Sequence, residues 1–327
     1  MAILKIRGLH KKFISESTIQ VLKGVGFEVK KGQHVFIIGE TGSGKSTLLK
    51  VIFGLHIPEK GAVWLNNEKL QFENQLIPGV DEMKLVEQDF NLKKFNTVRS
   101  AIESKLEIGL NKRQKQNKTN ELLDLFQLRK LAPKQILQIS GGQQQRVALA
   151  QAFANLPQVL LLDEPFAHLD PQLKTNIFRY INNCIVKNGL TVLTVTHDFM
   201  ETLKHADWVI ALEKGKIAQE GEPRELYEKP VNKYIAGLLG SFSELKLDDN
   251  IWLLRPENII LEKKGDYEGE ILSLRYGGNH YEVEINYDKQ VLITHFPLNN
   301  NFAAGDKIRF NLELKREVID QLVFSEQ

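Results

Sequence analysis

The chain has 327 residues, more than one ordinary domain needs and suitable for two. Its composition, with 42% hydrophobic and 26% charged residues, is that of a globular protein and excludes wholesale disorder. The formal net charge of +2 argues against a dedicated nucleic-acid binder, because such proteins usually carry a strong excess of basic residues.

Cysteine content and hydropathy indicate a protein of a reducing compartment that does not itself cross a membrane. Cys184 is the single cysteine, so the chain cannot form an internal disulfide. Residues 1–8 lack the long apolar core of a signal peptide. Nowhere do about 18 apolar residues run together, so we expect any membrane-spanning part to belong to other chains.

The first 240 residues have the alternating pattern of an α/β fold. Buried strands are predicted by short apolar runs at residues 34–38, 159–162, 191–196 and 208–212. Helices are predicted at residues 46–55, where Gly54 is a stop signal, and from about residue 140 to Asn155. Residues 92–139 are mostly helical in pattern, and the polar, basic run at 111–120 within them is interpreted as a solvated loop.

After Gly240 the pattern changes to short strands separated by turn signals. These strands are predicted at residues 251–254, 267–274, 280–285, 290–295 and 307–314. Such spacing is typical of a small all-β barrel or sandwich. We therefore expect an α/β domain at residues 1–240, a linker at 241–250 and an all-β domain at 251–327.

A P-loop, Gly-Glu-Thr-Gly-Ser-Gly-Lys-Ser at residues 39–46, stands between a predicted strand and a predicted helix. Its glycines let successive backbone N–H groups turn toward phosphate oxygens, and the start of the helix adds its positive end. Lys45 is expected to reach the β- and γ-phosphates and to act in catalysis by stabilising charge on the γ-phosphoryl group. The Ser46 hydroxyl is expected to bind Mg²⁺. The residues expected to bind the nucleotide here are Gly39, Gly42, Ser43, Gly44, Lys45, Ser46 and Thr47.

Two carboxylates follow the apolar run at residues 159–162. Asp163 and Glu164 are therefore expected at the carboxyl end of a buried strand, where ligands bind in open α/β sheets. Asp163 suits the Mg²⁺ shell, and Glu164 suits a base that activates water. The alternative, acidic residues in an ordinary loop, is weakened by the P-loop upstream on the same chain.

A second glycine-rich segment, Gln-Ile-Ser-Gly-Gly-Gln at residues 138–143, opens the helix predicted from about residue 140. It is another candidate anion site at a helix N-terminus, although a simple cap made of Ser and Gly is a common alternative. One ATP has little need of two such sites on one chain. We therefore predict that the segment serves a nucleotide held by another copy, through Ser140, Gly141, Gly142 and Gln143.

Together these motifs resemble the nucleotide-binding subunit of ABC transporters over about residues 3–240. The family signature Leu-Ser-Gly-Gly-Gln stands here as residues 139–143, with Ile139 in place of Leu. The resemblance implies a P-loop NTPase with a RecA-like core and a helical subdomain at about residues 92–140. It also implies hydrolysis of ATP with Mg²⁺ and a head-to-tail dimer of two copies.

Other positions match further family marks. Gln88 stands where the family's Q-loop glutamine binds Mg²⁺ and senses the channel, and we expect it to take part in catalysis. His197 matches the switch histidine that contacts the γ-phosphate. Phe13 stands where an aromatic ring stacks on adenine, although a lone aromatic near a strand is more often part of a core. Residues 167–170 resemble the D-loop, in which His168 is unusual and has no assigned role.

The tail is similar to the OB-like (TOBE) regulatory domain of importers for sugars, polyamines, ferric iron, sulfate and molybdate. Residues 252–257 resemble the Arg-Pro-Glu stretch of that domain, and residues 221–230 match the polar segment that precedes it. The resemblance implies an importer ATPase on the cytoplasmic face of the plasma membrane. Its expected partners are permease subunits and a separate solute-binding protein, and no nucleic acid is expected.

Two other functions remain open at this point. The first is the ATPase of an exporter or lipid-extraction system, which seldom carries such a β tail. The second is a soluble ABC ATPase whose tail binds nucleic acid. Aromatic residues that could stack on bases in that case are Tyr276, Tyr281, Tyr287 and Phe296.

Overall fold

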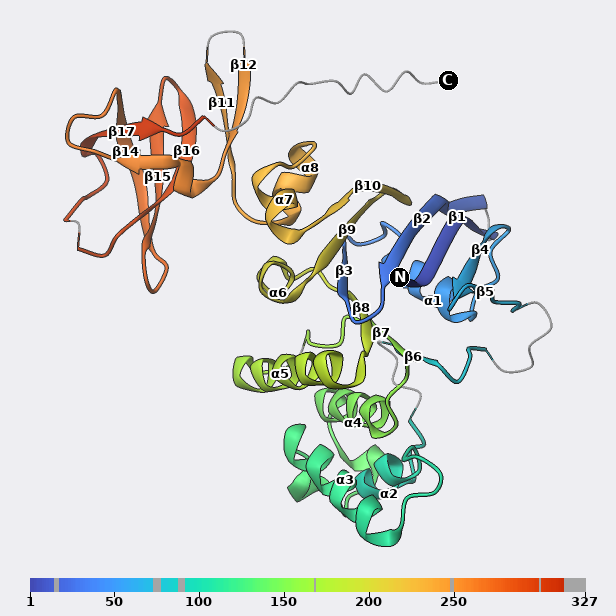
Figure 1. Ribbon diagram of the computed structural model, residues 1–327. Coiled ribbons are helices and arrows are strands. Elements are labelled where there is room, and N and C mark those ends of the chain that lie inside the picture. The colour runs from blue at the N-terminus through green and yellow to red at the C-terminus, as the bar shows by residue number, and fades with distance from the viewer. Residues whose placement is uncertain are drawn as a thin grey trace. The chain divides into compact units, whose positions relative to one another are not determined.

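Figure 1 shows the protein as a computed structural model, which describes residues 1–14, 18–72, 78–87, 92–167, 169–247, 250–299 and 301–314. The chain divides into two compact units, Met1–Pro223 and Arg224–Gln327. Buried apolar clusters lie within each unit, two in the first and one in the second. Each unit therefore has a core of its own.

A six-stranded sheet in the order β10-β9-β3-β8-β7-β6 forms the centre of the first unit (Figure 1). Neighbouring strands are parallel, except that β10 is antiparallel to β9. The strands are β3 (His34–Ile38), β6 (Met83–Val86), β7 (Val159–Asp163), β8 (Thr191–Val195), β9 (Trp208–Glu213) and β10 (Lys216–Gly221). The structure confirms the four apolar strands predicted from sequence, and β3, β7 and β8 are buried along their whole length.

Alternate residues of the central strands pack on opposite faces of this sheet, as the period of a strand requires. Ile37 and Leu161 join one cluster with α1 (Lys45–Phe53), and Phe36 and Leu160 join the other with α4 and α5. The remaining helices of this unit are α2 (Val98–Glu103), α3 (Lys112–Leu125), α4 (Gly141–Ala154), α5 (Pro171–Asn188), α6 (Phe199–His205), η1 (Arg129–Leu131) and η2 (Ile136–Gln138). Among the described helices, none is long and apolar enough to cross a lipid bilayer.

A separate antiparallel sheet in the order β2-β1-β4-β5 covers α1 from the other side. Its strands are β1 (Ala2–Ile14), β2 (Thr18–Lys30), β4 (Lys60–Leu65) and β5 (Glu68–Lys69). None of the strands predicted from the sequence lies in this sheet. Register shifts between Ile6 and Leu9 and again before Lys12 break the two-residue period, so the long strand was not evident.

The polar run at residues 111–120 is helix, not the solvated loop that we expected. It forms most of α3, which begins at the cap residue Asn111. The Asn111 side chain accepts a hydrogen bond from the Gln114 N–H at 3.0 Å, and the Gln114 side chain accepts one from the Asn111 N–H at 2.9 Å. This reciprocal capping starts the helix, and most of its polar residues face solvent, while Thr119, Leu122 and Leu123 are buried.

The second unit contains two short helices and a five-stranded antiparallel sheet in the order β13-β17-β14-β15-β16. Its elements are α7 (Pro223–Glu228), α8 (Lys233–Leu238), β11 (Ser243–Leu247), β12 (Asn250–Leu254), η3 (Pro256–Asn258), β13 (Ile259–Leu261), β14 (Tyr267–Tyr276), β15 (Tyr281–Tyr287), β16 (Gln290–Phe296) and β17 (Lys307–Leu312). Val283, Leu292 and Phe310 are among its buried residues. This β-rich architecture agrees with the predicted OB-like domain.

The division between the units differs from the expected boundary at residue 240. It falls after Pro223, and β11 occupies much of the expected linker. Arg255 accounts for the difference, because its guanidinium donates hydrogen bonds to the carbonyls of Ala236 at 3.0 Å and Gly240 at 3.1 Å. It also lies 4.1 Å from the centre of the Tyr227 ring. The short helices are therefore tied to β12, through contacts that a polar sequence does not reveal.

Candidate nucleotide site

The P-loop joins β3 to α1, and its backbone requires glycine. Gly39, Gly42 and Gly44 have φ angles of 150°, 84° and 105°, which L side chains rarely adopt. A Cβ added at Gly39 would lie 2.4 Å from the Leu212 carbonyl oxygen and 2.7 Å from the Ser43 Oγ. The loop therefore packs too tightly at its first position for any other residue.

A hairpin turn behind the P-loop holds it in place. The Ser43 carbonyl accepts a hydrogen bond from the Gly215 N–H at 3.1 Å, and the Gly215 carbonyl accepts one from the Lys23 N–H at 2.9 Å. A Cβ at Gly215 would lie 2.2 Å from the Val21 carbonyl oxygen. Gly215 is thus a supporting residue that sequence analysis missed. Its signal was a glycine shortly after the predicted strand at residues 208–212.

Lys45 begins α1 and points into the curve of the loop. Its ammonium donates hydrogen bonds of 2.8 Å to the carbonyls of Gly39 and Glu40. Burial lowers the pKa of Lys45, and the nearby carboxylates of Glu164 and Asp163 oppose that shift. A buried cation held by neutral carbonyls is suited to attract an anion.

Ser46 and Asp163 bring two oxygen donors together. The Ser46 hydroxyl donates a hydrogen bond of 3.0 Å to Oδ1 of Asp163 at the end of β7. Burial raises the pKa of Asp163, and this hydrogen bond opposes the rise. Among the described residues no group of three His, Cys, Asp or Glu side chains could hold a metal. The two oxygen atoms of Ser46 and Asp163 suit a hard cation that draws its other ligands from phosphate and water.

An unpaired hydroxyl provides a further test of fit for a phosphate. Ser43 Oγ is buried and has no hydrogen-bond partner among the described protein atoms. Buried polar atoms are normally paired, so this donor suits a ligand oxygen. Thr47, which was also predicted to bind nucleotide, lies half-buried in α1.

Glu164 and His197 face each other across the ends of β7 and β8. His197 Nδ1 lies 3.4 Å from Glu164 Oε2, and the His197 side chain is 67% exposed. Glu164 has a φ of 46°, an uncommon value for a residue with a side chain. Its N–H donates a hydrogen bond of 3.0 Å to the Val195 carbonyl, which fixes the turn against β8.

Gln145 supports this turn from α4 and was not predicted. Its buried amide donates hydrogen bonds to the carbonyls of Glu164 at 3.3 Å and Pro165 at 3.0 Å. Two bonds to consecutive carbonyls restrain the left-handed conformation of Glu164. The available signal was a glutamine on the buried side of a predicted helix.

The second glycine-rich segment is at the surface. Ser140 and Gly141 are exposed at the start of α4, and the Ser140 N–H donates a hydrogen bond of 3.1 Å to Gln143 Oε1. A Cβ added at Gly141 would meet no described atom within 4 Å outside its own helix backbone and chain neighbours. The structure links α4 to the turn after β7 through Gln145, five positions after Ser140.

Other predicted site residues lie apart or outside the described residues. Phe13 on β1 is 38% exposed and contacts the His56 ring edge-to-face, with 5.2 Å between ring centres. Lys11 Nζ lies 5.4 Å from the centre of the Phe13 ring. Gln88 and His168 lie outside the described residues.

Comparison with known proteins points to one family. The sequence profile described as ABC transporter matches residues 22–167. The sulfate/thiosulfate import ATP-binding protein of Mesostigma viride is 32% identical over 344 residues, covering 96% of this chain and 94% of that protein. The spermidine/putrescine import ATP-binding protein of Bacillus cereus is 31% identical over 327 residues, covering 97% and 98%.

Solved structures agree with the sequence relatives. The dimeric post-hydrolysis structure of the ATP-binding cassette MJ0796, bound to ADP and Pi, matches with a TM-score of 0.61 and 31% identity. It covers 68% of this chain and 99% of that one. The structure of cbiO1 from Clostridium perfringens matches with a TM-score of 0.58 and 27% identity, covering 70% and 91%. The chain therefore belongs to the family of ATP-binding subunits of ABC transporters and is an ABC-type ATPase.

Proposed function

We propose that this protein powers an ABC importer by hydrolysing MgATP between two copies of itself. The observation that carries the proposal is the cluster at the ends of β3, β7 and β8. It brings a buried cation, a pair of oxygen donors and a facing carboxylate and imidazole to one edge of the sheet. The cluster consists of Lys45, Ser46, Asp163, Glu164 and His197.

Each group has a role that its surroundings support. Lys45 and the P-loop N–H groups bind the phosphates, while Ser46 and Asp163 hold Mg²⁺, which would neutralise phosphate charge. Glu164 accepts a proton from the attacking water, because it is an ionisable carboxylate that directly follows Asp163 at the end of β7. His197 stabilises charge that develops on the γ-phosphoryl group.

A second copy completes the site in this proposal. Ser140 and Gly141 are exposed at a helix start, where N–H groups favour an anion, and space is open around Gly141. The matching cassette MJ0796 was solved as a dimer with ADP and Pi. We propose that Ser140, Gly141, Gly142 and Gln143 of one copy cover the nucleotide bound at residues 39–46 of the other. Phe13 would stack on its adenine, and Gln88 would contribute to the Mg²⁺ shell.

Import is the direction favoured by the relatives. Two that match nearly the whole chain are named import ATP-binding proteins, one for sulfate/thiosulfate and one for spermidine/putrescine. Since those cargoes have opposite charge, we assign cargo selection to other chains. The proposed partners are permease subunits and a solute-binding protein, and the proposed location is the cytoplasmic face of the membrane.

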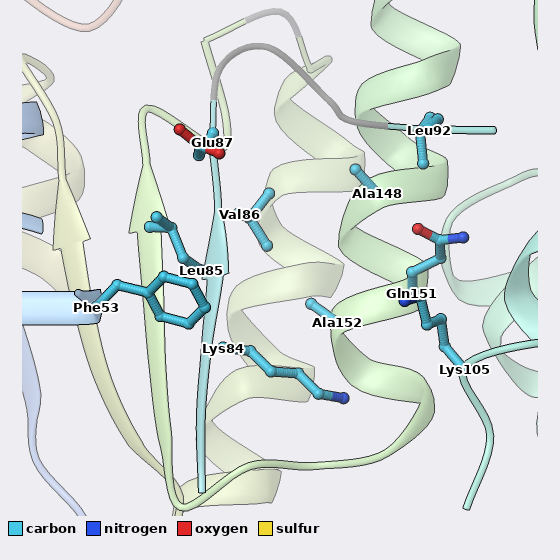
Figure 2. A pocket seen from close by; sticks show the side chains of 10 residues that line it. All are labelled: Phe53, Lys84, Leu85, Val86, Glu87, Leu92, Lys105, Ala148, Gln151 and Ala152. Carbon is cyan, nitrogen blue, oxygen red and sulfur yellow. The ribbon is translucent and has the colours of Figure 1, made fainter. Parts of the chain in front are cut away.

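A groove in the first unit is the proposed permease contact (Figure 2). It has a volume of about 260 Å³ and lies between β6 and α4. Its walls are mostly apolar, with Val86 on β6 pointing toward the helix α4 that carries Ala148, as Figure 2 shows. Burial and the charge of Lys105 lower the pKa of Lys84 to about 8. An apolar helix with an acidic side chain would suit these walls.

Replacement of Glu164 by Gln tests the proposed chemistry. The amide cannot accept a proton, so hydrolysis should fall by about 10² or more while MgATP binding persists. Steady-state phosphate release and equilibrium binding of labelled ATP would measure both, and size-exclusion chromatography should show an ATP-bound dimer. Near-normal turnover would rule out Glu164 as the base. Recovery of a permease and a solute-binding protein with the native chain would test import.

A further inference from the structure

A partly buried ion pair lies directly behind the loop that carries His197. Lys174 on α5 donates a hydrogen bond of 2.7 Å from Nζ to Glu201 Oε1 on α6. The same ammonium lies 3.7 Å from Asp198 Oδ2. The side chains of Lys174 and Glu201 are 23% and 9% exposed. The contact is therefore partly removed from water, unlike an ordinary surface pair.

The pair is connected to both ends of the short loop between β8 and α6. The Asp198 N–H donates a hydrogen bond of 3.0 Å to Thr196 Oγ1, and the Glu201 N–H donates one of 3.0 Å to Asp198 Oδ1. The Thr196 hydroxyl donates to Glu201 Oε2 at 3.5 Å. His197 lies between Thr196 and Asp198, so its backbone is held on either side while its ring stays exposed.

Lys174 also connects this loop to the chain that follows Glu164. It lies in the first turns of α5, where Asp170 is the cap and accepts a hydrogen bond of 2.9 Å from the Leu173 N–H. The chain from Glu164 leads through Pro165 into this helix. The ion pair therefore closes a ring that joins the segment carrying Glu164 to the segment carrying His197.

We propose that Lys174 and Glu201 are a positioning pair that holds His197 in place against Glu164. The inference rests on the proposed function, in which His197 acts on the γ-phosphoryl group. Neither side chain of the pair is assigned a contact with the nucleotide. Both act through the loop that carries His197.

The physical reason is the cost of a buried charge. Burial raises the pKa of Glu201, and Lys174 opposes the rise. Asp198 is the other charged group close to this carboxylate, and it disfavours the ionised form. Without Lys174 the carboxylate must take up a proton or move toward water. Either change disturbs the hydrogen bonds with Thr196 and the Glu201 N–H that hold the loop.

Lys174→Met should lower kcat by about tenfold and change the KM for ATP by less than about twofold, because misplacement of a catalytic group affects turnover first. Lys118→Met is the matched control, since Lys118 is also ion-paired and also contacts α5, through a 2.8 Å hydrogen bond to Tyr180. Its kcat should stay within about twofold of the wild type. Lys174→Arg should recover most of the lost turnover. An unchanged kcat in Lys174→Met would overturn the inference.

A double-mutant cycle with His197→Ala separates positioning from general stability. In single-turnover assays, Lys174→Met should cause no further loss once His197 is absent, because the pair then has nothing to position. An equal loss in both backgrounds would overturn the proposal. If Lys174→Met does not fold, the neutral pair Lys174→Met with Glu201→Gln takes its place in the cycle. Full activity in His197→Ala would contradict the proposed role of His197 as well, whereas loss there without loss in Lys174→Met would contradict the pairing alone.

Discussion

The P-loop and the segment at residues 140–143 are both glycine-rich and both begin a helix, but their surroundings differ. Gly39 is packed so closely that an added Cβ would meet the Leu212 carbonyl oxygen at 2.4 Å. Gly141 lies in open space at the surface, with no described atom within 4 Å of such a Cβ beyond its own helix backbone and neighbours. Contacts within the chain explain why residue 39 is a glycine. No such contact among the described atoms explains the glycine at residue 141.

This difference teaches how a glycine can be interpreted. A glycine required for packing has contacts that can be found within the chain, whereas one that keeps a surface open has none there. The second kind is expected where another molecule approaches the backbone closely. Residues 140–143 therefore fit a surface for a phosphate presented by another copy.

The largest expected effect comes from splitting the two segments between copies. Lys45→Ala removes the P-loop cation, and in the proposed dimer Gly142→Asp would place a carboxylate against the γ-phosphate. Each variant alone should lose about 10² or more in ATPase activity. In a mixed dimer one composite site carries both changes and the other is intact. An equal mixture should recover about a quarter of wild-type activity if the sites act independently.

Recovery in the mixture should depend on total protein concentration and on the mixing ratio, because both chains are needed. A disulfide test complements it, with Cys184 replaced and cysteines introduced near Ser43 and near Gly141. Crosslinks in MgATP should join two chains. Crosslinks found solely within one chain would contradict the head-to-tail dimer.

The glycine contrast itself can be tested by alanine. Gly39→Ala should destabilise the protein by about 3 kcal/mol, through steric overlap and backbone strain. Gly141→Ala should leave the melting temperature unchanged or slightly higher, since Ala favours a helix, while ATP hydrolysis falls. Thermal denaturation and phosphate release would measure both. A Gly141→Ala protein that melts lower but keeps its activity would reverse the comparison.

A smaller effect is expected where the helix α4 contacts the turn that carries Glu164. Gln145→Met removes two hydrogen bonds to the carbonyls of Glu164 and Pro165, and kcat should fall by about tenfold with little change in ATP binding. Stability should change little, because Gln145 Oε1 is itself buried without a partner among the described atoms. Gln158→Met, at an exposed position whose side chain contacts Asn66, is the control. Equal kcat values for the two variants would show that Glu164 keeps its position unaided.

The smallest effect concerns the strand that leads into the P-loop. His34 is buried on β3 beside Thr194, and its ring Nε2 lies 2.8 Å from Thr194 Oγ1. The backbone N–H of His34 donates a hydrogen bond of 2.7 Å to Oδ2 of Asp207. Burial, with a smaller contribution from His205, lowers the pKa of His34 to about 3. The folded protein therefore keeps this ring neutral, whereas the unfolded chain binds a proton below a pH of about 6.5.

Stability should consequently fall as the pH drops below that value. The contribution of His34 between pH 8 and pH 5 is about 2 kcal/mol, lost on acidification. Urea denaturation at both pH values would measure it. His34→Asn should show a pH dependence weaker by that amount, and identical slopes in the two proteins would exclude His34 as the source.

Much of the fold and part of the site were evident in the sequence. The central strands were predicted from short apolar runs, and Lys45, Ser46, Asp163, Glu164 and His197 were predicted as a set. Their mutual contacts follow from topology, because the carboxyl ends of parallel strands meet at one edge of a sheet. Half-exposed strands such as β1 and the polar helix α3 were missed, since a bulge hides one pattern and a polar surface hides the other.

The sequence by itself determined the family, the P-loop and the order of motifs, because these depend on backbone conformation and charge within a few consecutive residues. The tertiary structure alone decided which residues support them. Gln145 meets Glu164 across 19 positions, and Lys174 meets Glu201 across 27. Such contacts depend on how distant segments pack, and a buried hydrogen bond or ion pair leaves no periodic trace in the sequence around either partner.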